Sequence, residues 1–149
     1  MIKKHSSQRL AILCDADNLE IPRDGGPRRW IDWARLLEQM NGRELVRAIY
    51  YRPDAYFPDE VQRSVEEAGF EVRRTVKNSD AWIATEAFAL ANKADVIAFV
   101  GGDGDLEPVA ILLKAFGVRV EVWSWADKTS PRLREHADVF VPLGRDLLK

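Results

Sequence analysis

The sequence predicts an α/β fold, a three-layer α/β/α sandwich with a central parallel sheet. Short apolar runs alternate with segments of helical periodicity along the whole chain. Two of the runs, 10–14 and 96–100, are almost uniformly apolar, which is typical of central parallel strands buried on both faces. Gly69 and Gly117 stand where helices should end. A chain of 149 residues has the length of one ordinary domain, so we expect a single domain over 1–149.

We expect six strands, each a short run of apolar or alternating residues. In chain order they cover residues 10–15, 45–51, 70–76, 95–101, 118–125 and 138–143. The second and fifth carry more charge than the first and fourth, so they belong nearer the edges of the sheet. If the first and fourth strands are neighbours, the chain leaves them in opposite directions. The crevice between their carboxyl ends is then the place where open α/β sheets bind ligands.

Five segments between the strands have the 3.6-residue period of amphipathic helices. They cover residues 30–41, 59–68, 80–93, 105–116 and 130–137. The last begins with Ser130 and Pro131, a preferred N-cap residue followed by proline at the first helical position. The stretch IPRDGGPRR, residues 21–29, is rich in proline, glycine and arginine, and we expect it to be a long surface loop.

The composition argues against several functional classes. With 22 basic and 24 acidic residues the net charge is −2, so any anionic partner must be held by a local site. The single cysteine, Cys14, excludes an internal disulfide, and no His/Cys cluster has the spacing of a zinc site. His5 and His136 are far from any promising serine or cysteine, which disfavours a nucleophile–histidine enzyme.

The sequence also lacks the signals of a membrane or secreted protein. No apolar stretch approaches the roughly 20 residues that a membrane-spanning helix needs. The apolar run 10–14 is too short for the core of a signal peptide. We therefore expect a soluble protein in the cytoplasm that has no membrane partner.

Carboxylates follow the two central strands. Asp15 ends the first strand, and Asp103 and Asp105 follow the fourth in the segment GGDGDLE. Glycine-rich turns between a strand and a helix usually bind phosphate through backbone N–H groups, yet carboxylates would repel a phosphate there. A metal cation resolves this conflict, because the acids would bind the metal and the metal would bind the phosphate. Aspartate oxygens suit Mg²⁺ or Mn²⁺ better than zinc.

Most of these acids also have a structural explanation to be weighed. The segment LCDADNL, with Asp15 and Asn18, could form a polar turn whose side chains bond to the local backbone. Asp105 is a natural N-cap for the helix that follows it. Asp80 opens the segment 80–93, where an acidic residue interacts favourably with the helix dipole. Asp103 has no comparable structural explanation.

Two segments, one near the start and one near the middle of the chain, resemble the NYN domain family, a branch of the PIN-like metal-dependent ribonucleases. In that family an opening strand ends in aspartate and an asparagine follows three residues later, which LCDADNL matches with Asp15 and Asn18. A middle helix starts with an acidic residue, often after a lysine, which VKNSDAWIATEA matches with Lys77 and Asp80.

The second half of the chain continues the resemblance, which covers about residues 10–143. GGDGDL matches the family's Ser-Gly-Asp-Gly-Asp-Phe segment through Asp103 and Asp105. Gly101 replaces the usual serine and Leu106 the usual aromatic residue. A glycine before a late strand and the closing segment SPRLREHADVFVPL also fit the family.

The resemblance implies a PIN-like fold, with central strands in the order 3-2-1-4-5, and divalent-metal-dependent cleavage of RNA. It implies that Asp15, Asp80 and Asp103 bind Mg²⁺ or Mn²⁺, with Asp105 binding the ion or supporting those that do. Asn18 would orient a ligand or contact the scissile phosphate. The hypothesis that follows is in-line attack by water, which leaves a 5′-phosphate and a 3′-hydroxyl.

Glu86 is a further but weaker candidate for metal binding. It stands where many bacterial relatives carry aspartate. A six-residue offset on a regular helix places it about 240° around the axis from Asp80, so the two do not share a face. An ordinary solvated glutamate is the alternative explanation.

Basic and aromatic residues are candidates to bind RNA around the acids. The basic candidates are Arg52, Lys77, Lys128, Arg28 and Arg29. The first three follow carboxyl ends of strands, and the other two lie in the long loop, where they could bind flanking phosphates. Solvated surface charge explains each of them equally well. Trp82 or Trp125 could stack on a base, although packing also explains a tryptophan at either position.

The main hypothesis is therefore a Mg²⁺- or Mn²⁺-dependent ribonuclease with RNA as its partner. Two alternatives stay open. DADNL and GDGDLE also resemble parts of haloacid-dehalogenase-like phosphatases, although Tyr51-Arg52 stands where that family has serine or threonine. The other alternative is a non-catalytic RNA- or protein-binding module that keeps the acids as a scaffold. We also expect Tyr56 and Phe57 to be exposed, where they could form a homodimer contact.

Overall fold

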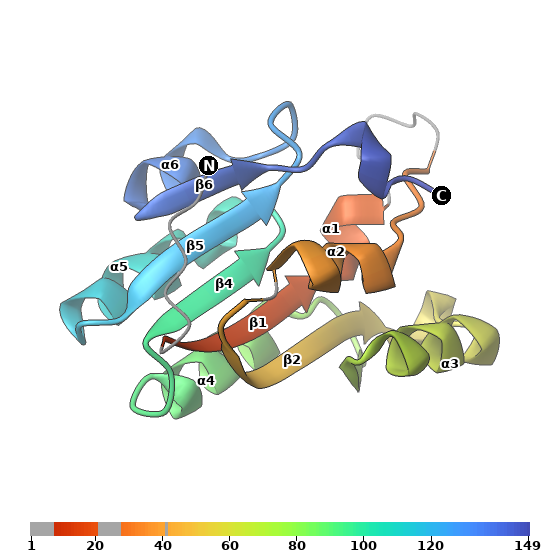
Figure 1. The fold of residues 1–149 in the computed structure, drawn as a ribbon, viewed down its shortest axis with the longest axis horizontal. Helices are drawn as coiled ribbons and strands as arrows, with labels where there is room; N and C mark the ends of the chain where they lie inside the picture. The colour runs from red at the N-terminus through yellow and green to blue at the C-terminus, as the bar shows by residue number, and fades with distance from the viewer. Residues whose placement is uncertain (1–7, 21–27, 41) are drawn as a thin grey trace.

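The computed structural model describes residues 8–20, 28–40 and 42–149, apart from the side chain of Asn18. The described residues form six strands, drawn as arrows in Figure 1. The strands are β1 (Arg9–Asp15), β2 (Glu44–Pro53), β3 (Glu71–Thr75), β4 (Val96–Val100), β5 (Arg119–Ser124) and β6 (Val139–Pro142).

Six α-helices connect the strands in the described part of the chain. They are α1 (Ala16–Glu20), α2 (Trp33–Met40), α3 (Asp59–Ala68), α4 (Asp80–Leu90), α5 (Glu107–Ala115) and α6 (Pro131–His136). Three 3₁₀ turns add η1 (Asp54–Tyr56), η2 (Gly104–Leu106) and η3 (Arg145–Leu147). Within the described ranges, no helix combines the length and the apolar character that crossing a bilayer requires.

The six strands form one parallel sheet in the order β3-β2-β1-β4-β5-β6. Cys14 of β1 lies opposite Tyr50 of β2 on one side and Val100 of β4 on the other, so both neighbours end near the end of β1. This confirms the expected order 3-2-1-4-5, which β6 extends at the β5 edge. All strand arrows in Figure 1 point toward one end of the sheet, where α1 follows β1.

Helices cover both faces of the sheet, which confirms the three-layer sandwich. One apolar core joins alternate residues of β1, such as Ile12, to Leu36 of α2 and Val65 of α3. The other joins the intervening strand residues to Ile83 of α4 and Val109 of α5. In Figure 1, α2 lies in front of the sheet, and α4 and α5 lie behind it.

Helix boundaries agree with the local sequence signals in most places. Gly69 adopts the left-handed conformation (φ 114°) at the end of α3, and Pro131 is the first residue of α6 after the N-cap Ser130. The short helix α1 is not among the expected helices, and it occupies the segment for which a polar turn was one explanation. The segment expected to be helical from residue 105 begins as the 3₁₀ turn η2 and becomes α-helical at Glu107.

Only one of the two residues expected at a homodimer contact is exposed. Tyr56 is 50% exposed, but Phe57 is 5% exposed and so corrects the expectation for that residue. The Phe57 ring packs 5.6 Å from the ring of Tyr50, and the Arg74 guanidinium lies 4.3 Å from its centroid. Phe57 therefore belongs to the core, and the homodimer has no support from it.

Candidate metal centre

The two central strands β1 and β4 deliver acidic residues to the carboxyl end of the sheet. From β1 the chain continues to β2 on one side, and from β4 it continues to β5 on the other. The crevice between them is the switch point at which open α/β sheets bind ligands. In β1, Ala11 and Leu13 pack into the core on the α4 and α5 face, and Asp15 continues this alternation. The Asp15 carboxylate therefore lies on the same face as α4.

Three of the predicted metal ligands lie close together at this switch point. One carboxylate oxygen from each of Asp15, Asp80 and Asp103 lies within 4.8 Å of the others. Asp15 is 3% exposed, whereas the other two are partly buried. Asp80 is the first residue of α4, where the helix dipole favours a negative charge. Close carboxylates repel one another unless a cation lies between them, and this set of oxygen donors fits Mg²⁺ or Mn²⁺.

The three aspartates belong to the wall of a cavity of about 260 Å³. The other residues in its wall are Asp17, Pro53, Asn78, Ser79 and Asp105. Ser79, Asn78 and Asp17 were not predicted as site residues. The signals present in the sequence were the position of Ser79 directly before Asp80 and the spacing of Asp17 in LCDADNL.

Two glycines let the loop after β4 pass close to its neighbours, Gly101 beside Asp15 and Gly102 beside Thr129. Gly101 has a φ of 146°, and a Cβ there would lie 3.1 Å from the Cβ of Asp15. A Cβ on Gly102 would lie 2.7 Å from the Cα of Thr129, closer than side chains tolerate. The glycine that replaces the family's usual serine at position 101 therefore suits this backbone conformation.

The two aspartates of the β4 loop have different structural roles from those expected. The Asp103 carboxylate accepts a hydrogen bond from the backbone N–H of Asp105 at 2.9 Å and so caps η2. Asp105 is exposed, and the N-cap of α5 is Leu106, which makes no side-chain capping bond. The interpretation of Asp105 as a helix cap is therefore wrong, and Asp103 does have a structural role. Asp105 lies in the cavity wall, outside the group of three close oxygens.

The structure contradicts both expectations for Glu86, that of a metal ligand and that of a solvated surface glutamate. Its side chain is 13% exposed and accepts hydrogen bonds from the Tyr51 hydroxyl at 2.9 Å and from Nε of Arg73 at 3.1 Å. Nη1 of Arg47 lies 3.9 Å from Oε2 of Glu86. Burial and the nearby Glu86 carboxylate raise the pKa of Tyr51. Two arginines thus compensate the charge of Glu86, which lies outside the acidic cavity wall.

Asn18 lies in α1, directly beyond β1, but its side chain is outside the described residues. Its expected contact with a metal ligand or a phosphate remains a prediction. Glu20 is the last residue of the same helix. Its buried carboxylate accepts a hydrogen bond from the Ile31 N–H at 3.1 Å. Burial raises the pKa of Glu20, and Arg52 opposes that shift.

Arg52 is corrected as a candidate for direct RNA binding. It is 3% exposed, because the alternation in β2 directs it into the core on the α2 face. Its Nη1 lies 3.6 Å from Oε1 of Glu20 and donates a hydrogen bond to the Tyr50 hydroxyl at 3.2 Å. The guanidinium therefore balances a buried carboxylate and is not available at the surface.

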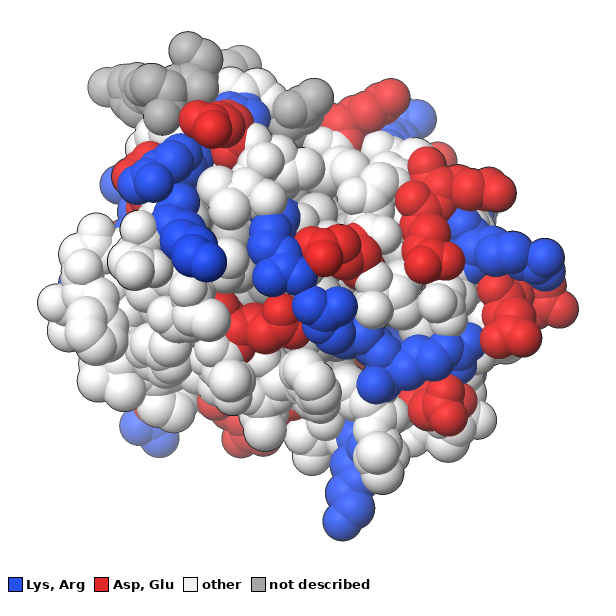
Figure 2. Space-filling view, turned by 90° about the horizontal axis from the view of Figure 1, so that it is seen from below, with Lys and Arg blue, Asp and Glu red and all other residues white. Residues whose placement is uncertain are grey.

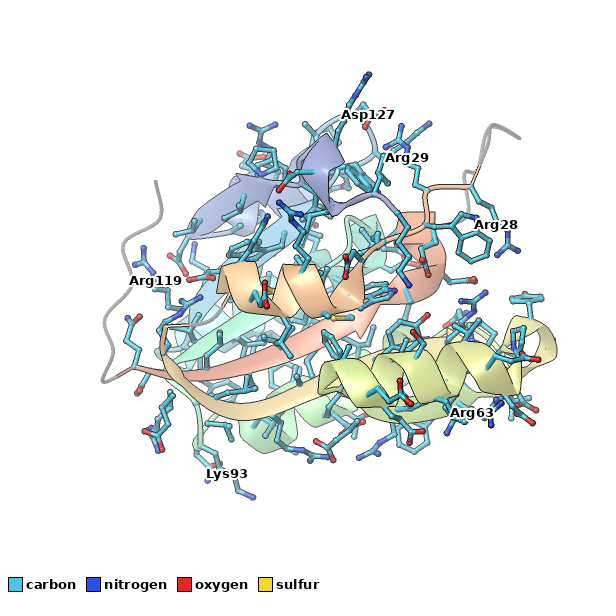
Figure 3. All side chains as sticks on the ribbon, turned by 45° about the vertical axis from the view of Figure 1, so that its right-hand side comes forward. Arg28, Arg29, Arg63, Lys93, Arg119 and Asp127 are labelled. Carbon is cyan, nitrogen blue, oxygen red and sulfur yellow. The ribbon has the colours of Figure 1, made fainter. Side chains whose placement is uncertain are left out.

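The other four basic candidates remain at the surface. Arg29 makes an ion pair with Asp127 at 2.9 Å and lies over the Trp125 ring, and it lowers the pKa of Asp127. Arg28 is exposed over the ring of Trp30. In Figure 3, Arg28, Arg29 and Asp127 lie at the carboxyl end of the sheet, and Lys93 and Arg119 lie at the opposite end. Lys77 and Lys128 are also exposed.

The charge distribution agrees with a local rather than a global attraction of anions. Figure 2 shows one face of the molecule, on which basic side chains are interleaved with acidic ones instead of forming a continuous positive field.

Of the two tryptophans considered for base stacking, Trp125 is buried and donates its indole N–H to the Leu19 carbonyl at 3.0 Å. Trp82, on α4, is 48% exposed.

Comparison with solved structures supports the fold. A protein of unknown function from Vibrio parahaemolyticus superposes with a TM-score of 0.83 at 25% identity, over 99% of this chain and 100% of that chain. A dehydrogenase from Clostridium difficile is less similar, with a TM-score of 0.42 at 14% identity, over 87% of this chain and 34% of that chain. No curated protein matches the sequence significantly.

Comparison with protein families identifies the domain. The family model of the NYN domain matches residues 9–144, essentially the whole chain. This range includes Asp15, Asp80 and Asp103. The chain belongs to the NYN domain family.

Proposed function

We propose that this protein is a ribonuclease that hydrolyses RNA phosphodiester bonds with the help of Mg²⁺ or Mn²⁺. The observation that carries the proposal is the meeting of Asp15, Asp80 and Asp103 at the switch point of a NYN domain. The three residues come from three distant parts of the sequence, and folding places their oxygens within reach of one ion. A divalent ion at such a site would activate water and neutralise the charge of a phosphodiester.

The protein side chains would divide the work as follows. Asp15, which is buried, would bind the ion from the end of a central strand. Asp80 would bind it from the start of α4, and Asp103 from a loop that its own capping bond holds in place. The exposed cations Lys77 and Arg28 would bind phosphates on either side of the cleaved bond.

The test is cleavage of end-labelled RNA by the purified protein in Mn²⁺, in Mg²⁺ and in excess EDTA. We expect cleavage with the metal ions, no cleavage in EDTA, and products that carry a 5′-phosphate. Asp103→Asn should lose the activity, although asparagine can still accept the hydrogen bond from the Asp105 N–H. The matched control is Asp59→Asn, at a side chain that is 93% exposed on α3, and it should cleave like the wild type.

Other outcomes would favour the alternative functions. If the wild type and Asp103→Asn bind RNA equally and neither cleaves it, the protein is a binding module. Release of phosphate from p-nitrophenyl phosphate, lost in Asp15→Asn, would favour a phosphatase. Equal cleavage of RNA in Mn²⁺ and in EDTA would contradict the metal-dependent mechanism.

A further inference from the structure

Two residues in the wall of the acidic cavity each carry a buried polar atom without a hydrogen-bond partner. The atoms are Oγ of Ser79 and Oδ1 of Asp17, and neither has a partner within the described part of the chain. Ser79 as a whole is only 3% exposed. Leaving a buried polar group unsatisfied costs about 1–3 kcal/mol. Native proteins therefore pair such groups with protein, ordered water or a ligand in most cases.

Ser79 directly precedes α4, but its hydroxyl does not cap this helix. Ser79 is the N-cap residue of α4, a position where serine usually accepts a hydrogen bond from a backbone N–H of the first turn. Here its backbone is already helical (φ −95°, ψ −1°) and its side chain makes no capping bond. The side chain of Asn78 instead accepts a hydrogen bond from the Asp80 N–H at 3.3 Å.

We propose that Ser79 is a positioning residue that accepts a hydrogen bond, through Oγ, from hydration water of the ion bound by Asp15, Asp80 and Asp103. The inference rests on the proposed metal site and adds a residue to it. Mg²⁺ and Mn²⁺ prefer about six oxygen ligands, and Mg²⁺ in proteins usually keeps several waters. Three aspartates with one oxygen each leave positions for water.

The chemistry of the unpartnered atoms agrees with this role. Water on a divalent cation directs its lone pairs at the ion and its hydrogens outward, so the surrounding protein must offer acceptors. A hydroxyl oxygen and a carboxylate oxygen are both acceptors, and Ser79 and Asp17 supply them in the same cavity wall. Residues that orient metal ligands in this way typically contribute about 10- to 100-fold in metal affinity.

The test measures binding of Mn²⁺ to the metal-free protein, without RNA, by the loss of the free-ion signal in electron paramagnetic resonance. Ser79→Ala removes only the hydroxyl, and we expect its dissociation constant for Mn²⁺ to rise about tenfold. Its melting temperature without metal should stay unchanged or rise, because an unsatisfied buried group has been removed. Ser79→Thr keeps a hydroxyl and should bind Mn²⁺ more tightly than Ser79→Ala.

A hydroxyl on the same helix provides the matched control. The Thr85 hydroxyl is exposed and already donates to the Ala81 carbonyl at 2.7 Å. Thr85→Val should therefore bind Mn²⁺ like the wild type.

Three results would overturn the inference. Equal Mn²⁺ affinity in Ser79→Ala and the wild type would show that the hydroxyl does not face the ion's water. A lower melting temperature of metal-free Ser79→Ala would show a structural role. Failure of the wild type to bind Mn²⁺ at all would overturn the metal site as well. If the wild type binds Mn²⁺ but does not cleave RNA, the proposed ribonuclease fails while the role of Ser79 is still decided by the affinities.

Discussion

Replacing Asp80 by asparagine is expected to lower the rate of Mn²⁺-dependent RNA cleavage about a thousand-fold, which corresponds to roughly 4 kcal/mol in the activation barrier. Asparagine keeps the shape of the side chain but removes one of the three negative charges that lie within 4.8 Å of one another. The ion would then be held less tightly and its position relative to the phosphate would change. Single-turnover cleavage at saturating RNA measures the effect on the chemical step.

The same substitution should leave the metal-free protein at least as stable as the wild type. Removing one carboxylate from the cluster relieves repulsion between like charges that no bound cation then offsets. Urea denaturation in EDTA measures this free energy of unfolding. A marked loss of stability in Asp80→Asn would mean that the carboxylate serves the fold, and unchanged cleavage would mean that it does not serve the reaction.

Glu121→Gln is expected to lower the free energy of unfolding by about 3–5 kcal/mol, more than any other substitution proposed here. Glu121 on β5 pairs with Arg43 at 2.6 and 3.2 Å, and their side chains are 1% and 0% exposed. The indole N–H of Trp123 donates to the same carboxylate at 3.0 Å. Glutamine cannot balance the guanidinium, so a buried charge is left without a counter-charge. Urea denaturation, with an unchanged dependence on urea concentration, measures the loss.

An exposed ion pair supplies the comparison. Glu71 pairs with Arg47 at 2.7 Å, but the Glu71 side chain is 47% exposed. Water screens this pair, so Glu71→Gln should cost less than about 1 kcal/mol. The double variant Arg43→Met/Glu121→Leu should recover most of the stability lost in Glu121→Gln, because both buried charges are gone. Equal losses in Glu71→Gln and Glu121→Gln would contradict the assigned burial.

The arrangement of the sheet and the position of three acids could be predicted from the sequence. The apolar runs 10–14 and 96–100 identified β1 and β4 as central strands, because only strands buried on both faces lack the alternation of polar residues. Once these strands are neighbours, the topology itself brings Asp15 and Asp103 to one crevice. Asp80 joined them through its place at the start of a helix and through the family resemblance.

The remaining site residues depend on contacts that a linear pattern does not contain. Arg52 follows the strand expected over residues 45–51, as an RNA-binding arginine would. In the structure β2 extends to Pro53, and its alternation and the buried partner Glu20 place Arg52 in the core. The sequence does not show whether Glu86 binds a metal or lies in solvent, because its partners Arg47 and Arg73 come from other elements of the fold. Ser79 looks in the sequence like an ordinary N-cap, and only its backbone angles and its unpartnered hydroxyl indicate another role.

A crystal structure of the protein grown with Mn²⁺, with the ion located by its anomalous scattering, tests the metal site most directly. We expect a Mn²⁺ ion about 2 Å from oxygens of Asp15, Asp80 and Asp103, within the cavity that these residues line. Anomalous density that lies elsewhere, or none in this cavity at Mn²⁺ concentrations that support cleavage, would contradict it.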